Sequence, residues 1–295
     1  MTAANLGPIT IEYEITGEGI PLLLVMGLGC QLIPWPDDFV QQIADHGFKV
    51  IRYDNRDMGL STKIDGGEPA GVGRVLSTMV SRRFAKSAYL LSDMADDAAN
   101  LLDHLGIDAA HVVGVSMGGM IAQTIAIEHP DRVLSLTSIM SNTGNRRTGQ
   151  PKPSLLAKMA RLIDPTAENM MENGVAGGRL ISGPHFDEAE ERSILQRAFD
   201  RNFNPAGTMR QMMAITASPD RTPGLRKLNV PTLVVHGLVD PLVQPSGGIA
   251  TARAVRDSRL LMFPDMAHDL PRNRWDEIIS AMVTNCMRAK VAARV

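Results

Sequence analysis

An apolar run near the middle of the chain stops at a tight turn rich in glycine and is followed at once by a second apolar segment. Residues 111–120 read HVVGVSMGGM, in which Gly114 and Gly118 flank Ser116. Glycines at these two places remove side chains that would collide with the neighbouring strand and helix, and the turn then holds the serine hydroxyl above the sheet. The segment therefore predicts a strand–turn–helix unit with Ser116 at the carboxyl end of a buried strand.

The same alternation of short apolar runs and helical segments extends along most of the chain. The expected strands are 21–26, 48–53, 110–115, 132–140, 231–236 and 259–263. The expected helices are one that opens at residues 35–38, then 90–105, 117–129, 246–256 and one from about residue 273. Buried strands alternating with helices predict an α/β protein with a mostly parallel central sheet flanked by helices.

One long segment breaks this alternation. Residues 145–225 have no clear strand, carry many charges and contain a third of the 18 methionines. We expect this segment to form a helical cap, inserted into a core made of residues 1–144 and 226–295. Several glycines near 65–75 suggest a mobile loop within the core.

Composition excludes several classes of function. A net charge of −2 gives no case for nucleic acid or an anionic membrane as a partner. Two cysteines without a CxxC motif predict neither a disulfide framework nor a zinc site. We see no signal peptide and no apolar stretch long enough to span a membrane. The expectation is a cytoplasmic protein without metal or cofactor that binds a small molecule, and its assembly into a homo-oligomer stays open.

A serine hydroxyl at such a turn needs a base, and the base needs an acid that orients it. In folds of this kind the acid and then the base follow later strands, in the chain order Ser, Asp, His. Asp240 comes just after the expected strand 231–236, and His268 just after 259–263. The sequence thus predicts a triad in which Ser116 is the nucleophile, Asp240 the acid and His268 the base.

Other titratable residues near the triad have simpler interpretations. Asp265 and Asp269 lie too close in sequence to the base to reach its far nitrogen, and we expect them to shape the loop. The alternative place for the acid, after the preceding strand, reads SNT at residues 141–143 and offers no carboxylate. His236 is expected to be a packing residue, whereas a position of His185 facing the pocket stays open.

A tetrahedral intermediate also needs hydrogen-bond donors for its oxyanion. We expect one donor to be the N–H of Met117, directly after the nucleophile. The second is expected from the loop after the strand 21–26, as the N–H of Leu28. Gly27 would let this loop bend toward Ser116, although an ordinary glycine loop is the alternative.

Five segments outside 145–225 share a pattern with a known group of proteins. They are LLLVMG at 22–27, WPDDF at 35–39, IRYDNRDMGLST at 51–62, HVVGVSMG at 111–118 and VPTLVVHGLVDP at 230–241. In these segments the chain resembles the α/β-hydrolase superfamily, in the branch of serine esterases that includes aclacinomycin methylesterase and related bacterial carboxylesterases. The resemblance implies the fold, the triad and the oxyanion donors named above. Two positions depart from it: Met26 stands where many relatives have histidine, and Asp57 where many have glycine.

The predicted function is hydrolysis of a small to medium hydrophobic carboxylic ester through an acyl-enzyme. Lactone hydrolysis, carbon–carbon bond hydrolysis and perhydrolysis on the same triad are the alternatives, followed by a ligand-binding protein without catalysis. Met209, Met212 and Met213 have the spacing of one helical face and are expected to form an adaptable apolar wall against the substrate. Packing within the insertion is the other reading of these methionines.

Overall fold

The computed structural model describes residues 2–64, 87–159 and 169–292. The expected loop near 65–75 lies outside the described residues. Within the described ranges, no helix has the length and apolar character needed to span a bilayer.

The centre of the molecule is an eight-stranded sheet with the order β1-β2-β4-β3-β5-β6-β7-β8. The strands are β1 (Thr2–Asn5), β2 (Thr10–Thr16), β3 (Ile20–Val25), β4 (Phe48–Tyr53), β5 (Ala110–Val115), β6 (Val133–Ile139), β7 (Thr232–Gly237) and β8 (Ser258–Phe263). Strand β2 pairs antiparallel with both β1 and β4, and all other neighbours are parallel. The mostly parallel sheet predicted from the sequence is confirmed.

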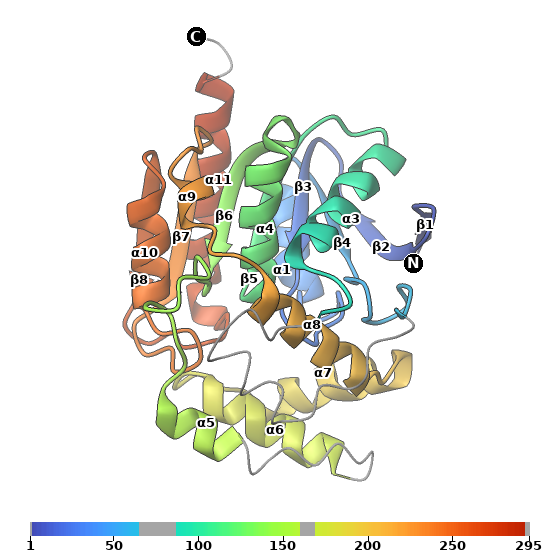
Figure 1. Ribbon diagram of the computed structural model, residues 1–295, viewed down its shortest axis with the longest axis vertical. Helices are drawn as coiled ribbons and strands as arrows, with labels where there is room; N and C mark the ends of the chain where they lie inside the picture. Colours follow the sequence, from blue (N-terminus) through green and yellow to red (C-terminus); the bar gives the residue numbers. More distant parts are fainter. Residues whose placement is uncertain (1, 65–86, 160–168, 293–295) are drawn as a thin grey trace.

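Helices cover both faces of this sheet (Figure 1). They are α1 (Asp37–Asp45), α3 (Leu91–His104), α4 (Met117–Glu128), α10 (Ser246–Ala254) and α11 (Trp275–Ala292), with short 3-10 turns at Pro130–Arg132 and Arg272–Arg274. Side chains of β3 alternate between the two faces, as a strand buried on both sides requires. Leu23 and Val25 pack with α3 and α4, whereas Leu22 and Leu24 pack with α1 and α11.

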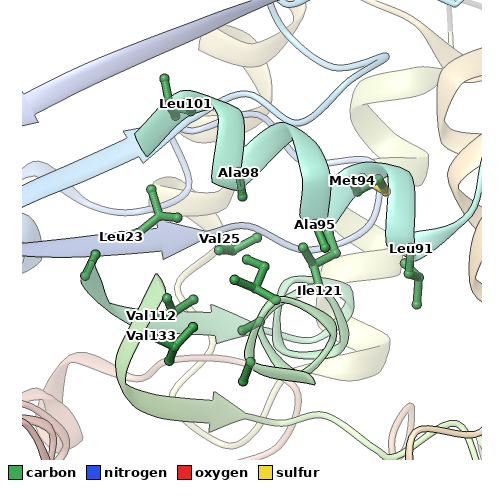
Figure 2. Close-up of a cluster of buried hydrophobic side chains, with 14 of the residues drawn as sticks. Leu23, Val25, Leu91, Met94, Ala95, Ala98, Leu101, Val112, Ile121 and Val133 are labelled. Atoms are coloured by element: carbon green, nitrogen blue, oxygen red, sulfur yellow. The ribbon is translucent and has the colours of Figure 1, made fainter. Parts of the chain in front are cut away.

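Figure 2 shows the first of these two clusters. Helix α3 presents a stripe of small and aliphatic side chains to Leu23, Val25 and Val112, with Ile121 of α4 beside them. The stripe has the spacing of one helical face, so helix periodicity and strand alternation meet in a single core. This packing fixes β3 and β5 side by side.

The order of the strands determines where a ligand can bind. From β3 the chain goes first to β4 on one side and later to β5 on the other side. In open α/β sheets, such a switch in direction leaves a crevice outside the carboxyl ends of the two strands. Gly27 follows β3 and Ser116 follows β5, so both stand at this switch point.

The chain between β6 and β7 is helical in its described part. It contains α5 (Pro153–Met159), α6 (Met170–Ile181), α7 (Glu188–Arg201), α8 (Pro205–Ala217) and α9 (Thr222–Leu225). Figure 1 shows α5, α6 and α7 together at the end of the molecule opposite the C-terminus. Helices α8 and α9 differ from these, because Ala214 and Leu225 belong to the core cluster on the α3 side of the sheet. We keep 145–225 as the proposed insertion, with its last two helices packed on the core.

Sequence reasoning located every parallel strand to within one or two residues and missed the first two strands. The helix expected to open at 35–38 begins at Asp37, with Pro36 just outside it. The missed strand β2 carries Ile11, Tyr13 and Ile15 in alternation with polar residues. That alternation was the available signal for an antiparallel strand.

Candidate active site

Ser116 occupies a strained backbone conformation between β5 and α4. Its φ is 54° and its ψ is −120°, which is rare for a residue with a side chain. A β-carbon at Gly114 would lie 2.1 Å from the carbonyl oxygen of Gly118, and one at Gly118 would lie 2.0 Å from that of Val25. No side chain fits at either position, so the glycines predicted for the tight turn are required by backbone contacts.

The side chains of Ser116, His268 and Asp240 form one hydrogen-bonded chain. His268 Nε2 is 2.9 Å from Ser116 Oγ, and His268 Nδ1 is 2.8 Å from Asp240 Oδ2. The loops after β5, β7 and β8 bring them together from positions up to 152 residues apart in the sequence. The geometry is that of a nucleophile, a base within reach of its proton and an acid that orients the base.

Asp240 is fully buried but well supplied with hydrogen bonds. Its Oδ1 accepts hydrogen bonds from the backbone N–H groups of Leu242 and Val243, each at 2.9 Å. Burial alone would raise the pKa of Asp240, but His268, His236 and the Val243 N–H outweigh it and lower the pKa to about 2. The carboxylate is therefore charged at neutral pH and can stabilise a protonated His268.

His236 supports this carboxylate without reaching the serine. Its Nε2 lies 2.7 Å from the Val243 carbonyl oxygen and 3.5 Å from Asp240 Oδ2. The side chain is fully buried. The structure thus places His236 in the packing role expected from the sequence, with an additional contact to the acid.

The two expected oxyanion donors belong to the residue after Ser116 and to the loop after β3. Among the described residues, no hydrogen bond uses the N–H of Leu28 or of Met117. A β-carbon at Gly27 would be 3.3 Å from Ser116 Cβ and 3.9 Å from its Oγ, so this loop lies directly against the serine. The role of both N–H groups as oxyanion donors stays a prediction.

The rival carboxylates shape the loop around the base. Asp269 accepts hydrogen bonds from Ala267 N–H and Gly183 N–H, at 2.9 and 3.0 Å. Asp265 binds Arg274 and lies 3.0 Å from His185 Nε2. His185, the alternative pocket residue, is thus engaged with Asp265.

The insertion also reaches the loops on the other side of the site. Two buried carboxylates follow β4, and each binds an arginine from a helix of the insertion. Asp54 pairs with Arg201 at 3.0 Å, and Asp57 pairs with Arg210 at 2.7 Å. Sequence reasoning missed these pairs, because the partners are about 150 residues apart and no local pattern links them.

Helix α8 makes one more contact that the sequence did not suggest. Gln211 is fully buried and accepts a hydrogen bond from the Gly29 N–H at 2.9 Å. Its Nε2 donates to the carbonyl oxygen of Arg56 at 3.0 Å. Gly29 belongs to the same loop as Gly27 and Leu28, so α8 contacts the loop that carries an expected oxyanion donor.

The three methionines of α8 differ in exposure. Met213 is buried, whereas Met209 and Met212 are partly exposed. Met213 faces the interior in the manner of a packing residue, and the role of Met209 and Met212 against a substrate stays a prediction. In the described ranges, no cluster of three or more His, Cys, Asp or Glu side chains could hold a metal ion.

Known proteins share this architecture over nearly the whole chain. A family model described as alpha/beta hydrolase fold matches residues 20–271. A rhodomycin D methylesterase of Streptomyces sp. (strain C5) is 28% identical, over 95% of this chain and 97% of the relative. A 2-hydroxymuconate semialdehyde hydrolase of Pseudomonas putida is 24% identical, over 85% and 82%.

The comparison with solved structures agrees at the level of the fold. An enol-lactonase from Burkholderia xenovorans superimposes with a TM-score of 0.74 at 21% identity, covering 97% of this chain and all of the lactonase. At this identity the likeness concerns the fold alone. The chain is therefore similar to proteins whose names describe different reactions.

Proposed function

Because this chain belongs to the α/β hydrolase fold family, we propose that it is a serine carboxylic ester hydrolase that uses Ser116, His268 and Asp240. The observation that carries the proposal is the hydrogen-bonded chain from Ser116 Oγ through His268 to Asp240, set at the switch point of the sheet. Two methylesterases among the relatives, each 28% identical over 95% of this chain, support the ester class.

The proposed mechanism follows from these positions. His268 Nε2 accepts the proton of Ser116 as its hydroxyl oxygen attacks the ester carbonyl carbon. Asp240 holds the imidazole by its Nδ1–H and stabilises the charged form that results. The N–H groups of Leu28 and Met117 stabilise the oxyanion of the tetrahedral intermediate.

The second half of the reaction reverses the proton transfers. His268 donates its proton to the leaving alcohol, and an ester bond to Ser116 remains. Water then gives a proton to His268 and attacks the acyl carbon. His268 passes this proton to Ser116 Oγ as the bond to the acyl group breaks, so that the carboxylic acid leaves and the serine is restored. The net reaction converts an ester and water into an acid and an alcohol.

We propose a small to medium hydrophobic ester as the substrate, with Gly27 and the helix α8 along its site. Gly27 lies against Ser116, and the loop that contains it also contacts α8. Met209 and Met212 on this helix would offer an apolar and adaptable surface.

Hydrolysis of p-nitrophenyl esters by the purified protein tests the proposal. The parent should turn over the acetate ester, and Ser116→Ala should lose at least about a thousandfold in kcat, because nothing replaces the nucleophile. Ser141→Ala is a matched control. The Ser141 hydroxyl lies beside the turn and donates to the Ser116 carbonyl oxygen at 2.8 Å, whereas the ring nitrogens of His268 bond Asp240 and Ser116.

The control should keep activity within about tenfold, since it loses one backbone contact and no reacting group. A folded Ser116→Ala variant with activity within tenfold of the parent would refute the role of the nucleophile. A parent that hydrolyses no ester and is not labelled by a fluorophosphonate would favour a ligand-binding protein instead.

A further inference from the structure

We infer that Gln211 is a positioning residue that holds the loop of the Leu28 oxyanion donor in its working conformation; this inference rests on the proposed function. The residue lies on α8, outside the triad, and contacts the loop through the Gly29 N–H. Its role follows from the geometry of a single turn.

The turn spans residues 27–30 and is closed by a hydrogen bond from the Cys30 N–H to the Gly27 carbonyl oxygen at 3.3 Å. Leu28 occupies the second position of this turn and Gly29 the third. Gly29 has a φ of 71°, the left-handed conformation that type II turns require at that position. The Leu28 N–H lies on the first peptide plane of the turn, between Gly27 and Leu28. This plane shares the Leu28 α-carbon with the central plane, so a fixed central plane restrains the residue that carries the N–H.

Turns of this size can change type by rotation of their central peptide plane, here the plane between Leu28 and Gly29. That plane carries the Gly29 N–H, which donates to Gln211 Oε1 at 2.9 Å. In the rotated form the N–H would point away from Gln211 and leave a buried amide oxygen without its partner, which is unfavourable. Gln211 therefore favours one of the two orientations of the peptide plane between Leu28 and Gly29.

The far end of Gln211 is firmly held as well. Its Nε2 donates to the Arg56 carbonyl oxygen at 3.0 Å. The Arg56 guanidinium forms two hydrogen bonds with Asp97 of α3, at 2.6 and 2.7 Å. Gln211 thus connects the turn to a fixed part of the core.

Packing around the turn agrees with this role. A β-carbon at Gly29 would lie 3.0 Å from Thr208 Cγ2, so α8 is in close contact with the turn along more than one residue. The Asn55 side chain donates to the carbonyl oxygen of Met26 at 3.1 Å and holds the beginning of the loop. Among the described residues, the hydrogen bond that holds the central peptide plane of the turn comes from Gln211 of α8.

Gln211→Met, which keeps the length of the side chain and removes both hydrogen bonds, tests the inference. We expect kcat for p-nitrophenyl acetate to fall about 10- to 100-fold and KM to change less than about threefold, since the oxyanion exists only in the transition state. The inhibition constant of a trifluoromethyl ketone, which forms an oxyanion on the serine, should rise by the same factor as kcat/KM falls. Exchange of backbone amides in residues 27–32 should accelerate.

Gln31→Met is the matched control. Gln31 is also buried and also joins the core to the insertion, through hydrogen bonds to the carbonyl oxygens of Ala198 and Asn202 at 2.6 and 2.9 Å. It bonds none of the N–H groups of the turn. The control should lower thermal stability and leave kcat within about threefold, because the central peptide plane keeps its partner.

Gln211→Asn provides a second test of the inference if Gln211→Met does not fold. It keeps a polar group at the site but is one methylene too short to reach both partners, so kcat should fall in the same way. A kcat for folded Gln211→Met within threefold of the parent, or a loss no larger than that of Gln31→Met, would overturn the inference. A parent protein without any ester turnover would instead refute the proposed function. In that case, unchanged amide exchange in Gln211→Met would still show that Gln211 does not hold the turn at residues 27–30.

Discussion

At the carboxyl edge of the sheet, backbone segments approach one another too closely for any side chain. The helical insertion is held to that edge by hydrogen bonds and ion pairs instead. Gly118 approaches the carbonyl oxygen of Val25 so closely that a β-carbon would lie 2.0 Å away. Helix α7 of the insertion, by contrast, has no buried residue, and α6 has only Val175. The backbone at Ser116 is therefore fixed by contacts within the core, to which α6 and α7 contribute little buried surface.

The contacts of the insertion nevertheless end on the loops that form the site. The Ile181 carbonyl oxygen accepts a hydrogen bond from the His268 N–H at 2.9 Å, and Gln211 binds the Gly29 N–H. Arg201 and Arg210 bind the buried carboxylates after β4. Changes in the insertion can therefore alter the loops around the triad without altering the turn of the nucleophile.

The largest difference between the two regions should appear when the same substitution is made in each. Gly118→Ala places a methyl group against the backbone of β3 and should destabilise the protein by at least about 4 kcal/mol, with loss of folded, active protein. Gly177→Ala in α6 meets no atom within 4 Å and should stabilise by about 0.5 to 1 kcal/mol, because alanine favours the helix. Thermal or urea unfolding measures both. A folded and active Gly118→Ala variant would contradict the claim that backbone contacts at this edge leave no room for a side chain.

A second contrast concerns two aspartates near the base. Asp240→Asn should lower kcat by about 10⁴-fold, because the amide favours the wrong tautomer of His268. Asp265→Asn removes a contact to Arg274 and to His185 of the insertion and should cost less than about tenfold in kcat, because the partly exposed carboxylate does not touch the imidazole. Steady-state kinetics on one ester decides between them. The reverse ranking would move the acid to Asp265.

Two arginines of the insertion should differ in their effect on stability. Arg210→Met leaves the buried carboxylate of Asp57 with Tyr89 and the Ile64 N–H as its partners within the described part of the chain, and should destabilise by about 3 to 5 kcal/mol. Burial would raise the pKa of Asp57, and the hydrogen bond from Arg210 is the strongest of those that lower it. Arg192→Met, on the exposed surface between α6 and α7, should leave the melting temperature nearly unchanged. Equal melting temperatures for the two variants would show that the buried pair does not secure the insertion.

The smallest effect is expected from the methionines of α8. Replacing Met209 and Met212, which are partly exposed, with alanine should change the preference between short and longer acyl chains by about fivefold or more, while the acetate ester is still hydrolysed. Met171→Ala in α6 is the control and should leave the preference unchanged. The values of kcat/KM across a series of p-nitrophenyl esters measure this acyl-chain preference. An unchanged profile in the folded double variant would assign these methionines to packing of the helix.

The sequence predicted the parts that depend on neighbouring residues. The turn at Ser116 is a local pattern of a serine between glycines, and Gly114 is required by the backbone of Gly118 within the same turn. Asp240 and His268 could be found because each follows a strand that its apolar run reveals, and parallel strands end at one edge of the sheet. The backbone geometry then brings the three side chains within hydrogen-bond distance.

The rest depends on side chains that meet only after folding. Nothing near Asp54 or Asp57 in the sequence indicates an arginine about 150 residues away. Nor does the spacing on α8 distinguish Gln211, which binds the turn, from Met212, which is partly exposed. Helix periodicity predicts on which face of the helix a residue lies, but not which residue it contacts. The contacts that attach the insertion to the core are therefore visible only in the structure.

The central claim is that Ser116 forms a covalent intermediate, and labelling with a fluorophosphonate tests it most directly. The reagent reacts with a serine only where a base removes its proton and donors hold the oxyanion. Mass spectrometry of the digested protein should find one modified peptide, the one that contains Ser116, and no label in Ser116→Ala. Modification of a different residue, or ester turnover by a parent that takes up no label, would contradict the account.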